Sequence, residues 1–247
     1  MKSFSKLLKT ELKMSIRGMD MVIFAIILPI IVTVILGFIF GAKPAFEGAD
    51  YTFFDQSFGA IITIAICAGG VMGLPLVVSD YRSKKILKRF KVTPISPAKI
   101  LIVQLMIYAI YAIASLILIY ITAILFFDFH FKGSFLPFLG SYFLVMASMF
   151  SIGMAVGGLA PNTKIAGVTA SVLYFPMLIF SGATLPYDIM PTAMQKVANI
   201  MPLTQGIKIL KATSLGLPIN NVLIPIIIMV VLVILCVGVS IRFFKWE

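Results

Sequence analysis

Six long apolar runs alternate with short polar segments along the chain. They cover residues 21–41, 57–79, 101–127, 135–160, 164–185 and 219–241. Apart from Lys164 at the start of its run, none contains Lys, Arg, Asp, Glu or His. Each run has about the 20 residues that a helix needs to cross roughly 30 Å of hydrocarbon. The pattern predicts an all-α integral membrane protein with six transmembrane helices, built as a single transmembrane domain over residues 1–247.

Residues 1–20 have a second periodicity, with basic side chains three or four positions apart. The basic face consists of Lys2, Lys6, Lys9, Lys13 and Arg17, and the opposite face of Phe4, Leu7, Leu8 and Leu12. This pattern favours an amphipathic interfacial helix over a merely basic tail. The apolar run that follows is too long for a signal peptide and lacks a small-x-small cleavage site, so we expect it to be retained as the first span.

Helix breakers mark the segment around and after the fifth run. Pro176 lies inside that run, and Ser181-Gly182 lies near its end. Residues 186–218 then form an outer segment, in which Met194, Val197, Ala198 and Met201 recur at helical spacing after Pro191. We expect the fifth helix to end near Gly182, and a short amphipathic helix with Pro191 in first position to be interfacial or re-entrant.

Charge supports a membrane location and predicts an orientation. The chain is 61% hydrophobic and 12% charged, with a mean hydropathy of +1.11 and a net charge of +11. Its basic residues lie in short blocks beside apolar runs, which argues against a nucleic-acid-binding face. With the N-terminus inside, inner segments hold 15 Lys and Arg and outer segments five. The bias predicts that both termini are cytoplasmic.

Residues able to carry catalysis or hold a metal are scarce. The single histidine, His130, lies in a short aromatic-polar loop typical of an interfacial belt, and we expect no metal site. Cys67 and Cys236 each lie inside an apolar run and are best explained as buried apolar residues. Residues 158–164 only approach a P-loop and are interpreted as a tight turn. No catalytic residues are therefore predicted, and the chain is not expected to be an enzyme.

Small residues recur in two Gly-x-x-x-Gly patterns that allow close helix contacts. They are Gly69 with Gly73, and Gly153 with Gly157. Packing within the chain and contact with a second copy both explain such patterns.

The longest polar interruption, residues 80–100, contains seven Lys or Arg and one acid. It begins Asp80-Tyr81-Arg82-Ser83-Lys84-Lys85 and ends in the turn Leu87-Lys88-Arg89-Phe90-Lys91-Val92-Thr93-Pro94-Ile95-Ser96. This turn resembles that of the cytoplasmic loop of type-2 exporter permeases of the ATP-binding cassette (ABC) family. The outer pattern Phe180-Ser181-Gly182, with Pro186, Pro191 and Pro202, resembles the segment after that family's fifth span. The loop's opening departs from the Glu-Arg-Glu and Gly-Thr that the family often has.

The resemblance implies a mechanism and a set of site residues. Two permease subunits, as a homodimer or related heterodimer, would dock cytoplasmic ABC ATPases and move a substrate outward across a prokaryotic plasma membrane. ATP and Mg²⁺ would bind the partner ATPase, and this chain would bind no cofactor. The coupling helix of the loop would contact the ATPase through Asp80, Arg82, Lys84, Lys85, Leu87, Phe90, Thr93 and Pro94.

The resemblance leaves the substrate open. A drug-like, antimicrobial-peptide or lipid-like substrate, as in multidrug resistance, is the main expectation, and a polysaccharide or lipid-linked glycan is the alternative. Aromatic residues that would line a glycan path are equally explained by packing: Phe24, Tyr108, Tyr111, Tyr120, Tyr174 and Phe175. The alternative of another class is an ATP-independent carrier or channel, for which a charged site within the membrane would be typical.

Overall fold

The computed structural model describes residues 2–41, 43–45, 50–86, 96–183, 187 and 190–243. Six of its helices are long and apolar enough to cross a membrane, which confirms the predicted spans. In chain order the elements are α1 (Lys2–Gly18), α2 (Asp20–Val22), η1 (Ile23–Ile27), α3 (Leu28–Phe40), α4 (Phe53–Cys67), η2 (Ala68–Gly73), α5 (Leu74–Ser83), α7 (Pro97–Phe127), α8 (Phe135–Leu159), α9 (Thr163–Phe180), α10 (Thr192–Ile200), α11 (Pro202–Leu215), η4 (Ile219–Val222) and α12 (Leu223–Phe243). Within the described residues there is no strand, only an isolated bridge between Pro44 and Thr52.

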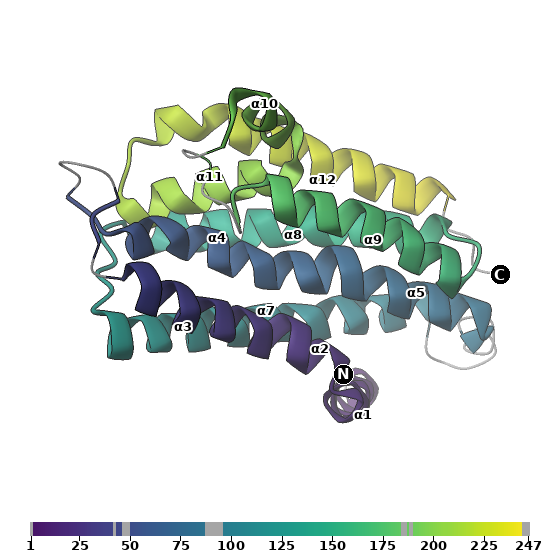
Figure 1. The fold of residues 1–247 in the computed structure, drawn as a ribbon. Helices are drawn as coiled ribbons and strands as arrows, with labels where there is room; N and C mark the ends of the chain where they lie inside the picture. The colour runs from purple at the N-terminus through teal and green to yellow at the C-terminus, as the bar shows by residue number, and fades with distance from the viewer. Residues whose placement is uncertain are drawn as a thin grey trace.

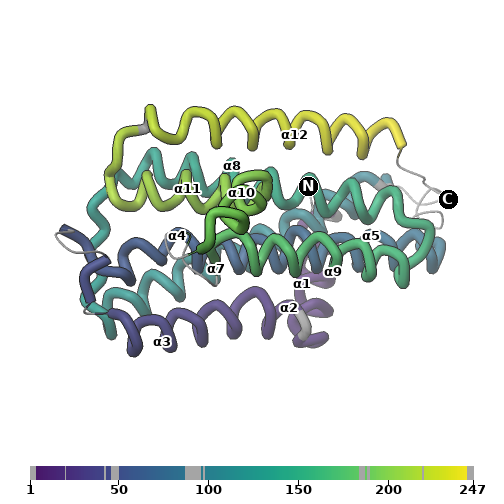
Figure 2. The backbone as a smooth tube through the Cα atoms, turned by 45° about the horizontal axis from the view of Figure 1, so that its top comes forward, coloured from purple at the N-terminus to yellow at the C-terminus, as the bar shows by residue number. Residues whose placement is uncertain are grey.

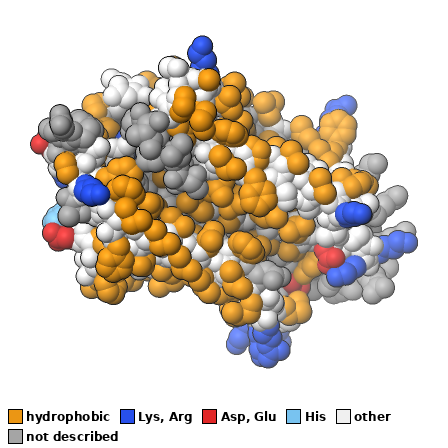
Figure 3. Space-filling model, viewed as in Figure 1, with side chains coloured by type: hydrophobic (Ala, Val, Ile, Leu, Met, Phe, Trp, Pro, Cys, Tyr) orange, Lys and Arg blue, Asp and Glu red, His pale blue; other side chains and the backbone are white. Residues whose placement is uncertain are grey.

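The long helices run side by side, and their connections alternate between two ends of the bundle (Figure 1). One end holds the α3–α4, α7–α8 and α11–α12 connections; the other holds the α5–α7 and α8–α9 connections and the end of α12 (Figures 1 and 2). Helix α1 lies across the bundle axis. On the face shown in Figure 3, hydrophobic side chains cover the middle of the bundle and the Lys and Arg side chains lie toward its margins.

Helices α4 and α5, joined through η2, form one continuous and largely buried span. It begins at a capping box in which the Asp55 amide donates to Thr52 Oγ1 (3.0 Å) and the Thr52 amide to Asp55 Oδ2 (2.9 Å). Because the helix extends beyond residues 57–79 at both ends, it also includes Asp80 and Arg82.

Close packing of this span against α8 requires glycine. A Cβ added at Gly157 would lie 2.8 Å from Val78 Cβ, and one added at Gly153 would collide with the carbonyl of Gly70. Added at Gly73, it would meet Tyr108 and Met21 of the same chain. The predicted Gly-x-x-x-Gly patterns therefore serve packing within the chain.

Aromatic side chains fill the bundle at the end that holds the α7–α8 connection. The Phe58 ring lies 4.3 Å from that of Phe129, measured between centroids, and 6.2 Å from that of Phe138. Phe54 packs against Phe127 and Phe129. The expectation of an interfacial belt in this loop is wrong for Phe129, which is buried because α4 supplies the rings of Phe54 and Phe58 and α7 supplies that of Tyr120.

The outer segment contains two helices where one was expected. Helix α10 follows Pro191, which is its N-cap and not its first helical residue. Helix α11 has Pro202 in its first turn, ends at Gly216 with a φ of 70°, and packs on α4, α8 and α12. Such a proline start and glycine stop are a common helix signature.

Candidate coupling site

The expected coupling residues lie in two parts of the chain. Asp80 and Arg82 belong to the last turns of α5, and Lys84 and Lys85 follow directly. Lys85 has a φ of 56°, so the helix ends there and the chain changes direction. The remaining expected contacts, Leu87, Phe90, Thr93 and Pro94, lie outside the described residues.

Arg82 points into the protein. Its side chain is buried, and Nη1 donates hydrogen bonds to the carbonyl oxygens of Gly157 (3.1 Å) and Ala160 (2.7 Å). These carbonyls belong to the C-terminal end of α8, where a helix has unsatisfied acceptors and a partial negative charge. The Arg82 guanidinium therefore already bonds to α8, and a contact of Arg82 with an ATPase stays a prediction.

A second polar contact joins α5 to α1 and α7. The Tyr81 hydroxyl donates to Glu11 Oε2 of α1, and Gln104 Nε2 of α7 donates to the same oxygen at 3.0 Å. Gln104 Nε2 also lies 3.2 Å from the Tyr81 hydroxyl. One carboxylate oxygen therefore holds three helices together. We call Glu11, Tyr81, Arg82 and Gln104 the α5 node.

Two further contacts support the node. The Tyr111 hydroxyl donates to Ser15 Oγ at 2.9 Å, a second bond between α7 and α1. Ser83 Oγ lies 3.3 Å from Thr163 Oγ1 at the start of α9. The apolar face of α1 also packs on α7, where Val103, Ile107 and Tyr111 are buried. Because each contact ties another helix to the end of α5 or to α1, the helices at this end are positioned relative to one another.

Sequence patterns did not identify Tyr81, Glu11 or Gln104 as site residues. The available signals were weak: Glu11 is the only acid in α1, and Gln104 is one of few polar residues inside a span.

The side chains that remain accessible beside the node are mostly charged. Lys84 Nζ pairs with Asp80 Oδ2 at 2.8 Å, and Lys84 stays 65% exposed. Lys85 and Ser83 are also exposed. The node thus presents a basic surface within about one helical turn of the buried contacts, where the chain enters the loop.

Two spans contain π-helical segments that touch each other. They are η1 in the first span and η2 in the second, and Met21 of the preceding turn meets Gly73 at the end of η2. Short π-helical segments interrupt the regular hydrogen-bond ladder of a helix and are frequent at functional sites. The node is therefore connected to a mid-span irregularity by the single helix α5.

The outer motif terminates the fifth span as expected. Helix α9 ends at Phe180, the Ser181 amide donates to the Met177 carbonyl, and Gly182 has a φ of 88°. Ser181 is buried, and its hydroxyl accepts from the Ala183 amide at 3.3 Å. Pro186 lies outside the described residues.

Polar contacts hold α10 and α11 to each other. Lys208 Nζ donates to Asn199 Oδ1 at 2.6 Å and lies 5.2 Å from the ring centroid of Tyr187. Asn199 Nδ2 donates to the Tyr187 hydroxyl, and Gln205 Nε2 donates to the Asn199 carbonyl. Burial lowers the pKa of the Lys208 amine.

Other candidate residues fall into structural roles. Tyr108, Tyr111 and Tyr174 are buried, as the packing interpretation requires, whereas Phe24 and Phe175 are exposed. The P-loop-like turn is an α8–α9 connection in which Asn162 Oδ1 caps the Ile165 amide at 2.9 Å. Among the described residues, no group of three or more His, Cys, Asp or Glu side chains is arranged to hold a metal ion.

Comparison with known proteins identifies a family and several relatives. The family model described as ABC-2 type transporter matches residues 2–215. Over 72 residues the chain is 40% identical to Nodulation protein J of Rhizobium leguminosarum bv. viciae and 35% identical to Nodulation protein J of Rhizobium meliloti (strain 1021). Each match covers 29% of this chain and only 28% of the relative.

Proposed function

The chain belongs to the ABC-2 type transporter family and is a multi-pass membrane subunit of a transporter, and from this premise we propose that it works as an ATP-driven exporter permease. A separate ABC ATPase subunit would bind ATP and Mg²⁺ and hydrolyse the nucleotide. This chain would convert the closure of that ATPase into movement of its spans. The observation that carries the proposal is the α5 node, which joins the end of α5, where the loop at residues 80–100 starts, to α1, α7 and α8.

The ATPase would dock on the exposed side of the node. Asp80, Lys84 and Lys85 are accessible there, and Leu87, Phe90, Thr93 and Pro94 remain the expected contacts further along the loop. Arg82 takes a positioning role in this proposal, because its guanidinium bonds to α8. A displacement of the docked loop would then act on α5 and, through Arg82 and Tyr81, on α8, α7 and α1 together.

Movement of α5 needs a place where the second span can change shape. The segment η2 contains Gly69, Gly70 and Gly73, and the π-helical segment η1 of the first span lies against it. We place the hinge here, since the regular helical hydrogen bonding is already interrupted.

The substrate path would lie between spans two and five of two subunits. Helices α5 and α9 pack together, and the Ser171 hydroxyl lies 3.9 Å from Met72 Sδ of η2. On α9 an apolar stripe remains exposed, made of Ile165, Val168, Val172, Phe175 and Ile179. Its alternating spacing of three and four residues suits contact with a helix of a second permease subunit, a copy or a relative.

In this mechanism the chain lies in the plasma membrane of a prokaryote, and both of its termini are cytoplasmic. The ends of α5 and α12 and the start of α7 share one end of the bundle (Figure 1), and 15 of the 20 Lys and Arg lie in the sequence segments expected on this side. The matched relatives come from bacteria. The outer segment, with α10 and α11, would then lie on the export side as an interfacial or re-entrant element, and α1 would lie in the cytoplasmic interface.

The substrate we propose first is drug-like, peptide-like or lipid-like, because the described wall of the spans is overwhelmingly apolar. A polysaccharide or lipid-linked glycan is the alternative, and transport of the two classes can be compared in one preparation.

The test uses inverted membrane vesicles that contain the chain and its co-expressed ATPase. We expect substrate uptake to stop when ATP is depleted and to continue when the proton gradient is collapsed, because no proton-relay carboxylate lies within the described spans away from their ends. Uptake that follows the proton gradient and ignores ATP would instead identify a secondary carrier.

A further inference from the structure

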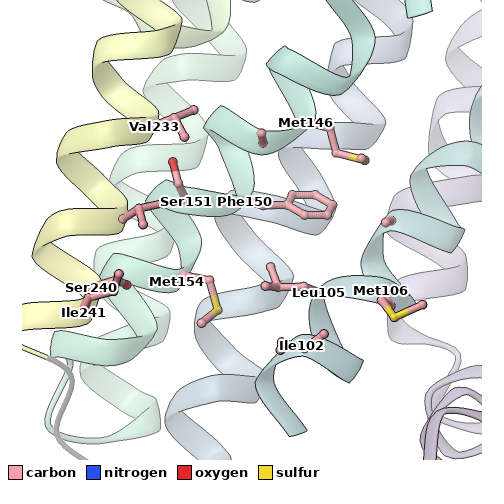
Figure 4. Close-up of a pocket in the computed structure, with 13 residues that line it drawn as sticks. Ile102, Leu105, Met106, Met146, Phe150, Ser151, Met154, Val233, Ser240 and Ile241 are labelled. Carbon is pink, nitrogen blue, oxygen red and sulfur yellow. The ribbon is translucent and has the colours of Figure 1, made fainter. Parts of the chain in front are cut away.

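An apolar groove of about 510 Å³ lies between α7, α8 and α12 (Figure 4). Phe150 and Met154 of α8 form its floor, Leu105 belongs to the α7 wall, and Val233 and Ile241 belong to the α12 wall. The groove stays open because α12 packs along α8, whereas α7 packs mainly on α1 and α3. It lies apart from the α5–α9 face where we place the substrate path.

The groove has the length of a single membrane leaflet. Its lining extends over residues 146–154 of α8 and 233–241 of α12. Eight helical steps correspond to about 12 Å, and half of a roughly 30 Å hydrocarbon core is about 15 Å. The lining on α7 begins at Ile102, in the second turn of that helix, so the groove extends from mid-bundle to the end where α7 begins.

The polar side chains that line the groove are two serines, Ser151 and Ser240. The Ser151 hydroxyl already donates to the Ser148 carbonyl. The Ser240 hydroxyl is buried and has no hydrogen-bond partner among the described residues. Ser240 lies near the C-terminal end of α12, at the same end of the bundle as the start of α7.

The mouth of the groove attracts anions. Lys99 lies on α7 one turn before Ile102 and is exposed, on the side of the helix that continues into the groove. The first turn of α7 contains no acidic residue, and the N-cap residue Ser96 makes no side-chain cap hydrogen bond. A lysine at a helix N-terminus is unfavourable by itself, and a phosphate placed there would pair with the lysine and complement the positive end of the helix dipole.

We propose that this groove binds an anionic phospholipid of the leaflet at that end of the bundle. One acyl chain lies against Phe150 and Met154, the phosphate lies at Lys99 and the first turn of α7, and the Ser240 hydroxyl donates to an ester oxygen of the lipid. A membrane lipid is the occupant because the groove opens within the spans, is lined by hydrocarbon and has Lys99 at the membrane surface.

The test is photo-crosslinking in phosphatidylcholine vesicles that hold the full chain. Two probes carry the same diazirine acyl chain, one on phosphatidylglycerol and one on phosphatidylcholine, and the labelled peptides are mapped by mass spectrometry. We expect the phosphatidylglycerol probe to label residues 102–109, 146–154 and 233–241 about fivefold more than the phosphatidylcholine probe. This ratio corresponds to about 1 kcal/mol for one lysine near the membrane surface.

Two variants separate the contact with the acyl chain of the lipid from the contact with its phosphate. Ala147→Phe fills the groove and lowers labelling of these segments by both probes, whereas Val231→Phe, on the far side of α12, leaves it unchanged. Lys99→Gln removes the preference for phosphatidylglycerol but keeps the labelling, and Lys164→Gln on α9 keeps both. Equal labelling of the groove and of the exposed face of α3, or loss of the label on adding a transported substrate, would overturn the proposal.

Discussion

The two ends of the bundle are held together by different kinds of contact. At the end with the α5 node, hydrogen bonds from Arg82, Tyr81 and Gln104 connect helices that are distant in the sequence. At the opposite end, rings such as those of Phe58 and Phe129 pack in a cluster. Hydrogen bonds fix direction, whereas apolar packing tolerates small shifts as long as volume is conserved. The difference suits the proposed roles of the two ends: the end with the node would be displaced by the ATPase, and the aromatic end would hold the helices together.

The largest loss of stability is expected at the aromatic end. Phe58→Ala empties a fully buried position, and loss of a core Phe typically costs about 3–5 kcal/mol of unfolding free energy. The midpoint of thermal unfolding in detergent checks this. Phe135→Ala at the same end is the control, because Phe135 is 65% exposed. Equal midpoints for the two variants would mean that the cluster does not hold this end together.

The next largest effect is expected at Arg82. Arg82→Met removes two hydrogen bonds from a charged donor and leaves the carbonyls of Gly157 and Ala160 without it, at a cost of about 2–3 kcal/mol. Arg242→Met, an exposed arginine in the last turn of α12, is the matched control and should change the unfolding midpoint little. A midpoint as high as that of the control would contradict the structural role of Arg82.

A smaller effect is expected for the second contact of the node. Tyr81→Phe removes one hydrogen bond to Glu11, which keeps its bond from Gln104, so about 0.5–1.5 kcal/mol is lost. Hydrogen exchange of the backbone amides measures the effect locally. We expect the substitution to accelerate exchange in α1 and to leave exchange in α4 nearly unchanged. Tyr120→Phe is the control, since this tyrosine is partly exposed to the membrane. Unchanged exchange in α1 would show that the Tyr81 contact does not hold α1 in place.

Almost no loss of stability is expected for the exposed lysines. Double charge reversal, Lys84→Glu with Lys85→Glu, removes only the exposed pair with Asp80, and such helical pairs contribute about 0.3–0.5 kcal/mol. Recovery of the ATPase with the tagged permease should nevertheless fall steeply, while Lys196→Glu at the other end retains it. Full recovery with the double variant would move the docking surface away from these lysines.

A labelling experiment that does not depend on stability checks which end of the bundle faces the cytoplasm. Ser134 is the exposed N-cap of α8, at the end opposite the node. A cysteine placed there should react with a membrane-impermeant maleimide in intact cells. Reaction only after permeabilisation would reverse the proposed topology.

The spans were predictable because length and the lack of charge are local properties of the sequence. The amphipathic character of α1 was equally visible in its spacing of three and four residues. Helix α11 was missed because Lys208 and Lys211 interrupt the apolar pattern of the outer segment, whereas both lie half-buried on a packed helix. Periodicity does not show which part of such a helix is covered by other helices.

The site was only partly predictable, for a physical reason. The sequence pointed to Arg82 as a charged residue at the start of the loop. Its partners are backbone carbonyls 75 and 78 residues away. Because every residue has a backbone carbonyl, the residue types along the sequence do not show which carbonyls accept these bonds. The same holds for Tyr81 and Glu11, which are 70 residues apart and meet only because α1 folds back across α5 and α7.

The central claim is that the α5 node transmits work from a docked ATPase to the spans, and Arg82→Met tests it most directly. The measurement is the number of substrate molecules moved per ATP hydrolysed by the reconstituted complex, at a temperature where the variant stays folded. We predict that the variant still binds the ATPase and hydrolyses ATP but moves at least tenfold less substrate per ATP. Transport per ATP equal to that of the unsubstituted complex would contradict the claim.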